Sequence, residues 1–344
     1  MRTIRVLCHS LMIATAVSAT AYAAPITVGG DAFTLVATQL GGPYQLFGLV
    51  ADGTANIYVG NNSNNTTGIP LQKFDPSLFS GAPIAFSNFG PSVGDADGMS
   101  FFGGNIYIAD RDEGLQKVAV PGATASLFRA ATAINGTGSP IVVRPGDGHV
   151  FVGRGGLTGD THIDEYDATG VFVATHNTGA DVETMTYDPA SGRIYYATFG
   201  SAVRALDPTT DIDVAVGSSS GTIDGGLTFD PISGLLFVGT ANGANSGLVE
   251  TINVSTGITT LFASGFDGST GILRDPFSGD LYFLSSSSIT GAQFNNALYR
   301  IESSKLPGEQ APEPATLALL GLGLAGLGFM RRRRGELKKG SSVL

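Results

Sequence analysis

Six carboxylate side chains occupy comparable places in a repeating sequence, and this placement could support metal chemistry. Alignment of the repeats matches Asp95 with Asp181 and Asp97 with Glu183, and two more aspartates fall in the corresponding segments of later repeats. The full set is Asp95, Asp97, Asp181, Glu183, Asp224 and Asp267. Carboxylates that converge on one point raise each other's pKa values unless a cation lies among them, and hard oxygen ligands favour Ca²⁺ or Mg²⁺. We therefore expect either a divalent-cation site or carboxylates that cap their loops and face water.

Compact catalytic motifs do not point to a particular reaction. The chain has no His-Glu-x-x-His motif and no phosphate-binding glycine loop. His149, His162 and His176 stand in different local contexts. The sequence therefore holds no positive evidence for catalysis, although propeller active sites need no compact motif.

Two further acidic clusters are expected to be structural. The first contains Asp110, Asp112 and Glu113 and follows an apolar run, so we expect an exposed turn. The second covers residues 160–167, whose alternating pattern predicts a strand that faces solvent.

Short aromatic and β-branched runs recur through the chain at an even spacing. They begin at Ile57, Ile106, Val150, Ile194, Leu236 and Leu281, so that successive starts lie 42 to 49 residues apart. Periods of about 40 to 50 residues with strand content are typical of propeller blades. Each run is apolar on both faces and is expected to form a central strand of its blade.

A turn motif repeats in front of these runs. Asp-Pro-x-Ser-Gly begins at Asp188, Asp230 and Asp275, a shorter form surrounds Asp52, and Arg144–Gly148 replaces it in the third repeat. Aspartate caps such a turn, proline presets φ, and glycine accepts a positive φ. We interpret these aspartates as parts of hairpin turns and not as metal ligands.

Four strands in each of six repeats predict an all-β protein, a six-bladed β-propeller over residues 24–302. The last repeat shows three clear strands, whereas the segment Phe33–Ala37 precedes the first repeat and has no blade of its own. We expect this segment to supply the outer strand of the last blade and join the two ends of the ring. A seven-bladed ring is disfavoured because the 49 residues between the first two runs do not accommodate two blades.

The C-terminal region has the organisation of a sorting tail. Residues 315–330 are uncharged and would span about 24 Å as a helix, which is short against a bilayer core of about 30 Å. The flanking residues are Pro312, Glu313 and Pro314 on one side and Arg331, Arg332, Arg333 and Arg334 on the other. Because four arginines stay on the cytoplasmic side, the body should lie on the opposite side of the membrane.

This arrangement resembles the PEP-CTERM sorting signal of Gram-negative bacteria, over residues 312–334. The resemblance implies recognition by an exosortase, a membrane-embedded cysteine-dependent protease or transpeptidase, and cleavage near Pro312–Pro314. It also implies an association with exopolysaccharide and biofilm matrix. The residues 335–344, which extend beyond the usual end of such tails, are expected to be cytoplasmic.

The N-terminal region predicts export. Residues 1–23 combine Arg2 and Arg5 with an apolar segment and end in Ala21-Tyr22-Ala23, which is the pattern of a secretory signal peptide. The mature chain would begin at residue 24 and, because Cys8 lies in the signal, would contain no cysteine. Disulfides, thiolate metal sites and cysteine nucleophiles are thereby excluded from the mature body.

The charge of the body restricts its partners. Residues 24–311 hold 11 Lys and Arg against 27 Asp and Glu, a formal charge of −16, whereas the whole chain has −10. Such a surface argues against nucleic acid and anionic lipid as ligands. Residues 303–311 are polar, contain Pro307 and Gly308, and are expected to link the ring to the tail.

Two classes of function remain open. The first is a non-enzymatic surface or matrix scaffold that presents loops to an exopolysaccharide or a surface protein. The second is a metal-dependent hydrolase or lactonase, or a lyase, that uses the central channel. Propellers of the gluconolactonase and regucalcin type, which this chain resembles in architecture alone, hold one such ion in the channel, but their ligand pattern is missing here.

Overall fold

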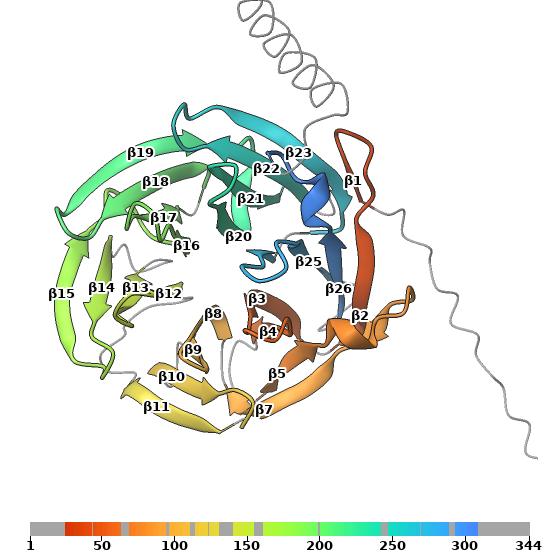
Figure 1. Cartoon of the computed structure of the whole chain (residues 1–344), viewed down its shortest axis with the longest axis horizontal. Helices are drawn as coiled ribbons and strands as arrows, with labels where there is room; N and C mark the ends of the chain where they lie inside the picture. The colour runs from red at the N-terminus through yellow and green to blue at the C-terminus, as the bar shows by residue number, and fades with distance from the viewer. Residues whose placement is uncertain are drawn as a thin grey trace, which may run out of the picture.

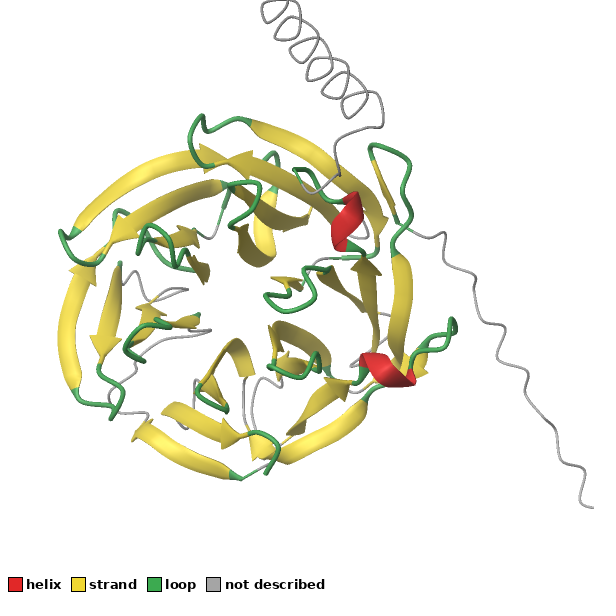
Figure 2. Cartoon of the chain, viewed as in Figure 1, coloured by secondary structure: helices red, strands yellow, loops and turns green. Residues whose placement is uncertain are grey.

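The computed structural model shows six antiparallel sheets arranged as blades around a central axis (Figure 1). It describes residues 25–42, 44–62, 69–93, 96–110, 114–122, 124–130, 140–154, 161–198, 200–241, 247–268, 270–288 and 293–308. Apart from two short 3-10 helices, the regular structure of this part of the chain is β-strand (Figure 2). The predicted all-β, six-bladed β-propeller is thus confirmed.

Each blade contains four antiparallel strands; they follow one another in sequence except that β6 intervenes in blade 1 and that blade 6 takes its outer strand from the N-terminal region. Blade 1 contains β3 (Gln45–Ala51), β4 (Ile57–Asn62), β5 (Ile69–Phe74) and β7 (Ser87–Val93). Blade 2 contains β8 (Ala96–Phe102), β9 (Asn105–Asp110), β10 (Gly114–Ala119) and β11 (Ala125–Ala130). Blade 3 contains β12 (Ile141–Val143), β13 (Val150–Arg154), β14 (His162–Tyr166) and β15 (Phe172–Asn177). Blade 4 contains β16 (Thr184–Tyr187), β17 (Ile194–Ala197), β18 (Ala202–Asp207) and β19 (Ile212–Ser218). Blade 5 contains β20 (Thr222–Asp230), β21 (Leu235–Ala241), β22 (Gly247–Asn253) and β23 (Thr259–Phe266). Blade 6 contains β24 (Gly271–Arg274), β25 (Leu281–Ser288), β26 (Phe294–Ile301) and β2 (Thr34–Gly42).

The apolar runs form the second strand of every blade, as predicted. Residues such as Ile57, Phe151 and Phe283 are fully buried there. The buried side chains of the described residues fall into six clusters, and each cluster joins one blade to the next. The hydrophobic core is therefore divided among the blade interfaces, and burial of apolar area between neighbours holds the ring together.

The N-terminal segment closes the ring. Strand β2 pairs antiparallel with β26, with Leu35 opposite Tyr299, so the predicted closure is confirmed. Two short strands that the sequence did not predict extend this edge. Strand β1 (Ile26–Thr27) pairs with β23 of blade 5, and β6 (Ile84–Ala85) pairs in parallel with β2. The N-terminal region thus fastens both of the last two blades.

The Asp-Pro-x-Ser-Gly motifs form the turns between the first and second strands of blades 4, 5 and 6. In blade 5, Asp230 accepts hydrogen bonds from the backbone of Ile232 at 3.2 Å and from the Ser233 hydroxyl at 2.5 Å. Gly234 has φ of 68°, a conformation that favours glycine. The structural interpretation of these aspartates is correct.

A second inter-blade contact repeats between the innermost strands. The hydroxyls of Ser100, Thr186 and Thr228 accept backbone N–H hydrogen bonds from the next blade at 3.0 to 3.2 Å. The donors are Val143, Phe229 and Arg274, respectively. These bonds fix the stagger of neighbouring blades near the axis.

Both interpretations of the minor acidic clusters need correction. Residues 162–166 form the third strand of blade 3, in which Asp164 and Glu165 are buried and contact Arg154 and Arg144, respectively. Asp110 ends β9 and is also buried, 1% exposed, where the Gln116 amide donates to its carboxylate at 3.3 Å. Asp112 and Glu113 lie outside the described residues. Alternation of charges misled the sequence analysis, because each of these blade-internal carboxylates has a polar partner.

The residues after the last strand pack on the ring. Ser303–Lys305 form the 3-10 helix η3, the Ser303 N–H donates to Asp280 at 3.0 Å, and Leu306 is fully buried in the core between blades 5 and 6. We call residues 303–308 the C-terminal hook. Within the described part of the chain no helix is long and apolar enough to cross a membrane, and the apolar run 315–330 lies outside that part.

Candidate functional site

The structure places the predicted carboxylates in and beside the loops that lead into the inner strands. Asp181 and Glu183 are half-buried just before β16, and the Glu183 N–H donates to the Ala197 carbonyl at 2.8 Å. Asp267 is half-buried between β23 and β24, where burial raises its pKa. Asp97 and Asp224 belong to β8 and β20, but their side chains and all of Asp95 lie outside the described residues.

The strand register shows that only some of the six predicted carboxylates occupy corresponding positions in their blades. Gly98 pairs with Ala109 and Thr184 with Ala197, so the residues just before them, Asp97 and Glu183, correspond. In blade 6 Gly271 pairs with Leu284, which puts Thr270, and not Asp267, at that position. Among the described residues no group of three or more His, Cys, Asp and Glu side chains could hold a metal ion. The cation site stays a prediction.

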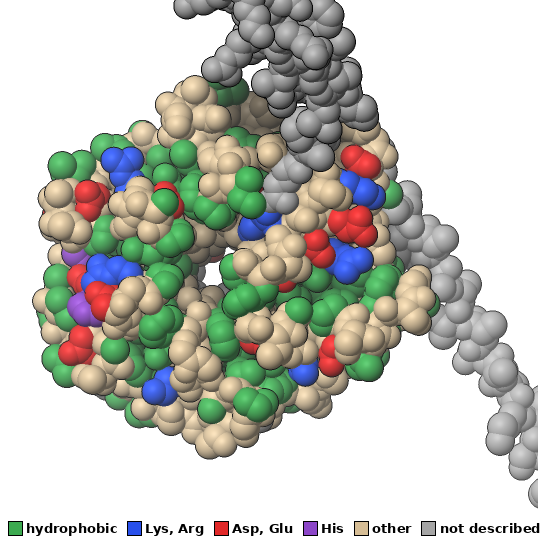
Figure 3. All heavy atoms as spheres, viewed as in Figure 1, with side chains coloured by type: hydrophobic (Ala, Val, Ile, Leu, Met, Phe, Trp, Pro, Cys, Tyr) green, Lys and Arg blue, Asp and Glu red, His purple; other side chains and the backbone are tan. Residues whose placement is uncertain are grey.

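Hydrophobic side chains surround the opening at the axis on the face shown in Figure 3. At equivalent register positions the inner strands carry apolar residues: Leu49, Met99, Ile141, Met185, Leu227 and Ile272. All but Met99 are buried. These six side chains belong to the hydrophobic clusters between neighbouring blades.

Two Gly-x-Ser-x-Gly patterns occur, at 90–94 and 217–221, and neither forms a nucleophile elbow. Ser92 lies within β7, and Ser219 follows the outer strand β19 and donates to the Gly221 carbonyl. A nucleophile elbow requires a strand, a sharp turn and a helix. In the described residues neither serine precedes a helix.

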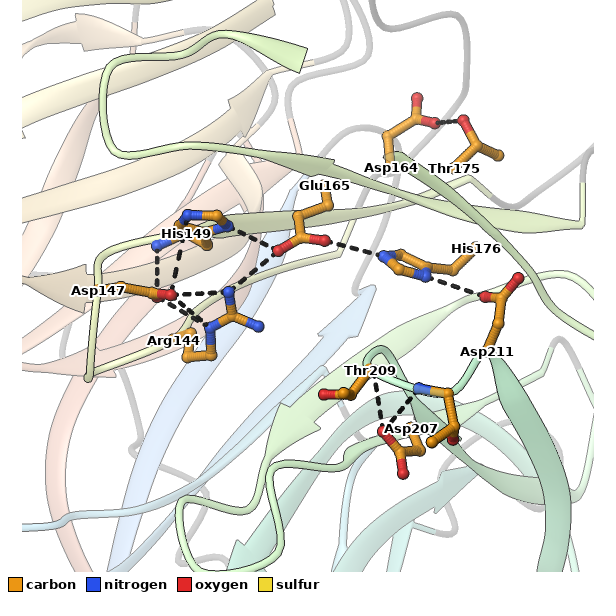
Figure 4. A network of polar contacts seen from close by, with 11 residues as sticks. Arg144, Asp147, His149, Asp164, Glu165, Thr175, His176, Asp207, Thr209 and Asp211 are labelled. Carbon is orange, nitrogen blue, oxygen red and sulfur yellow. Dashed lines mark hydrogen bonds and ion pairs between the residues drawn. The ribbon is translucent and has the colours of Figure 1, made fainter. Parts of the chain in front are cut away.

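A network of charged side chains, which the sequence did not predict, joins blade 3 to blade 4 (Figure 4). Its centre is Glu165 on β14, which is only 6% exposed. One oxygen contacts the Arg144 guanidinium at 3.1 Å and His149 Nδ1 at 2.6 Å, and the other contacts His176 Nε2 at 3.1 Å. The second nitrogen of His176 contacts Asp211 of blade 4 at 3.0 Å. We call these residues, with Asp147, the blade 3/4 network.

The network contains one arginine and three carboxylates. Asp147 accepts hydrogen bonds from Arg144, and these lower the pKa of Asp147 to about 2. Arg144 contacts the carboxylates of Asp147 and Glu165, whereas the carboxylate of Asp211 contacts His176. His176 bridges the two blades, because one ring nitrogen contacts Glu165 of blade 3 and the other contacts Asp211 of blade 4. The geometry suits a structural contact between blades.

Other buried ion pairs in the described residues are structural. Arg154 and Asp164 contact at 2.8 Å inside blade 3, and Arg274 contacts Asp230 at 3.3 Å across blades 5 and 6. Burial, and the contact with Asp213, raise the pKa of Tyr196. Each of these groups ties strands together.

Comparison with known proteins identifies the C-terminal motif. The family model for the PEP-CTERM protein-sorting motif matches residues 310–334, so the predicted sorting signal is confirmed. The matched residues begin two positions after Gly308, the last described residue, and all of them lie outside the described part of the chain. The motif marks a protein that is exported and membrane-anchored for exosortase sorting in Gram-negative bacteria.

The comparisons add little about the body. No curated protein matches the sequence. One similar solved structure is titled "Crystal structure of Nidogen/Laminin Complex". The two sequences are 16% identical, the alignment covers 62% of this chain and 78% of the chain in that structure, and the TM-score is 0.48. The propeller assignment rests on the strand topology described above.

Proposed function

We propose that the chain is an exported scaffold protein whose propeller presents loops to an exopolysaccharide or a surface protein of the biofilm matrix. The observation that carries this proposal is the sorting motif at 310–334, which follows directly after a ring that is closed by its own N-terminal strand. Exosortase is its processing enzyme. Residues 1–23 serve as the signal peptide, and residues 315–330 span the membrane before processing.

The topology supports an orientation for this scaffold. The hook contacts Asp280 and Ser233, which belong to the turns between first and second strands. The loops that carry Asp181, Glu183 and Asp267 enter the first strands and so lie at the other face of the ring. When the ring is held to the membrane through its hook, the face with the turns between first and second strands points toward the membrane. The entry loops then point away from the membrane. The entry loops are thus the surface offered to a matrix partner.

Replacement of Pro312, Glu313 and Pro314 by alanine tests the sorting step in the native host. The wild-type chain should be shortened and released to the surface, whereas the triple variant should remain in the membrane at its full length. Equal processing of the two chains would contradict the proposal. The assay needs an antibody against the propeller and immunoblots of membrane and surface fractions.

A metal-dependent hydrolase, lactonase or lyase is the second candidate. Asp267 favours it, because a half-buried carboxylate whose pKa is raised by burial, in a loop that leads into an inner strand, is typical of functional sites. Metal content and melting temperature of the secreted protein, with Ca²⁺ and with chelator, distinguish the two. Stoichiometric metal, lost in Asp97→Asn and Glu183→Gln, would favour the enzyme. A metal-free protein without a shift would favour the scaffold.

A further inference from the structure

An open hollow lies on the rim of blade 5, beside the place where the described chain ends. It has a volume of about 390 Å³. One wall is the turn that follows β1, with Val28 and Asp31, the floor is Leu261 and Phe262 of β23, and the other wall includes Lys305 of the hook. We call this surface the hook groove.

Both walls of the hook groove are firmly held. Thr27 donates to the Asp31 carbonyl at 2.8 Å, and Val28 donates to the Phe262 carbonyl at 2.8 Å. On the opposite wall, Leu306 is fully buried and its N–H donates to the Ser303 carbonyl at 2.9 Å. The hollow is therefore a formed surface.

The exposed part of the hook groove is mainly apolar. Val28 is 70% exposed and Leu261 is 41% exposed, and both lie against the buried Phe262. Lys305 and Asp31 supply one charge of each sign at the margin. An apolar centre with a polar margin is the usual composition of a protein–protein contact, and the small charge count does not favour a charged ligand.

The short distance to the sorting motif limits what can approach it. Gly308 lines the hook groove, and Pro312 is the fourth residue after it. Four residues reach about 14 Å when fully extended. Because a protein domain of about 100 residues already has a radius of gyration of about 13 Å, an enzyme that acts at Pro312–Pro314 meets the rim of the folded ring.

We propose that the hook groove is a contact surface for the membrane-embedded processing enzyme, which engages the folded propeller together with the sorting motif. This inference rests on the proposed sorting function. Because Gly308 lines the groove and Pro312 is the fourth residue after it, a partner that binds the motif also lies beside the groove. Processing thus depends on the folded state, because unfolding removes both walls of the groove.

Charge insertion in the groove tests the inference in the full-length chain, with the processed fraction followed over time in the native host. Val28→Asp and Leu261→Asp should each slow processing by about tenfold without lowering the melting temperature of the released ring. The matched control is Val171→Asp, on the rim of blade 3, where Val171 is 59% exposed. It should be processed at the wild-type rate.

A spacer variant separates contact from misfolding. Ten Gly and Ser residues inserted after Gly308 let the enzyme reach the motif without touching the rim. In this background Val28→Asp should have no further effect, since the two changes remove the same contact. A wild-type rate for Val28→Asp in the native-length chain, or an equal loss in the spacer background, would overturn the inference.

The alanine variant of Pro312–Pro314 runs in the same assay. If it is processed normally, the sorting function itself fails. If it is blocked while Val28→Asp behaves as the wild type, the sorting function stands and the contact surface fails.

Discussion

The interfaces between blades 5 and 6 and between blades 3 and 4 use charged residues in different ways. At the 5/6 interface, Asp230 is fully buried, closes its own turn and contacts Arg274 of the next blade. At the 3/4 interface, the corresponding turn starts at Arg144, and the contact with the next blade runs through Glu165 and His176 to Asp211. At both interfaces the contact with the next blade joins side chains that are distant in sequence, and only the turn bonds of Asp230 follow from a local motif. The 5/6 contact concentrates its charge in one buried pair, whereas the 3/4 contact distributes its charges over several side chains, among them Asp147, which loses its charge as the pH falls toward 2.

Loss of Asp230 should produce the largest effect. Asp230→Ala removes the turn bonds and the carboxylate that faces the buried Arg274 guanidinium, and it should lower the free energy of unfolding by about 3–5 kcal/mol. Asp188→Ala is the control, because Asp188 closes the same turn in blade 4 with Ala190 and Ser191. It should lose about 1–2 kcal/mol. Equal losses in urea unfolding would show that the Arg274 contact adds nothing.

Neutralisation of Glu165 should come next. Glu165→Gln weakens three contacts at the centre of the blade 3/4 network and should cost about 2–3 kcal/mol at pH 7. Chemical denaturation measures the change. A loss below about 1 kcal/mol, the usual value of an exposed ion pair, would mean that the network is a surface feature.

Removal of an inner hydroxyl should have an intermediate effect at the 5/6 interface. Thr228→Val leaves the buried Arg274 N–H without the 3.0 Å hydroxyl acceptor and should cost about 1–2 kcal/mol, independent of pH. Thr186→Val, which removes the equivalent contact with Phe229, should behave alike. No loss in either variant would contradict the role of these hydroxyls in joining neighbouring blades.

The pH dependence of the blade 3/4 network should be the smallest effect, and it comes from Asp147. Hydrogen bonds from Arg144 lower the pKa of Asp147 in the folded chain from 3.8 to about 2, so its stabilising contribution is present above pH 4 and is lost as the pH falls toward 2. Asp147→Asn should therefore be less stable than the wild type above pH 4, and chemical denaturation should show the two proteins converging as the pH falls toward 2. A difference that stays constant down to pH 2 would contradict this contribution of Asp147.

The sequence predicted the features that repeat or that act locally. The six runs, the Asp-Pro-x-Ser-Gly turns and the closing strand at Phe33–Ala37 each depend on residues close together in the chain. The sorting motif is likewise contiguous. These are the cases in which spacing alone determines the local structure.

The remainder depends on packing between distant segments. Glu165 and Asp211 come together only because blades 3 and 4 are adjacent, so the alternation of residues 160–167 suggested solvent exposure instead. The buried Asp110 was missed because its partner Gln116 lies on the neighbouring strand of the same blade, where strand pairing brings the two side chains together. Short edge strands such as β1 have no pattern of their own, since pairing with β23 defines them. The metal prediction remains open, because Asp95 and the side chains of Asp97 and Asp224 lie outside the described residues.

The intact mass of the protein recovered from the surface of its native host tests the central claim most directly. The account predicts a chain that ends near Pro312–Pro314 and lacks the apolar run and the four arginines, apart from any group added at the new C-terminus. A surface protein that still extends to Leu344 would contradict exosortase processing and, with it, the proposed role of the propeller as a sorted scaffold.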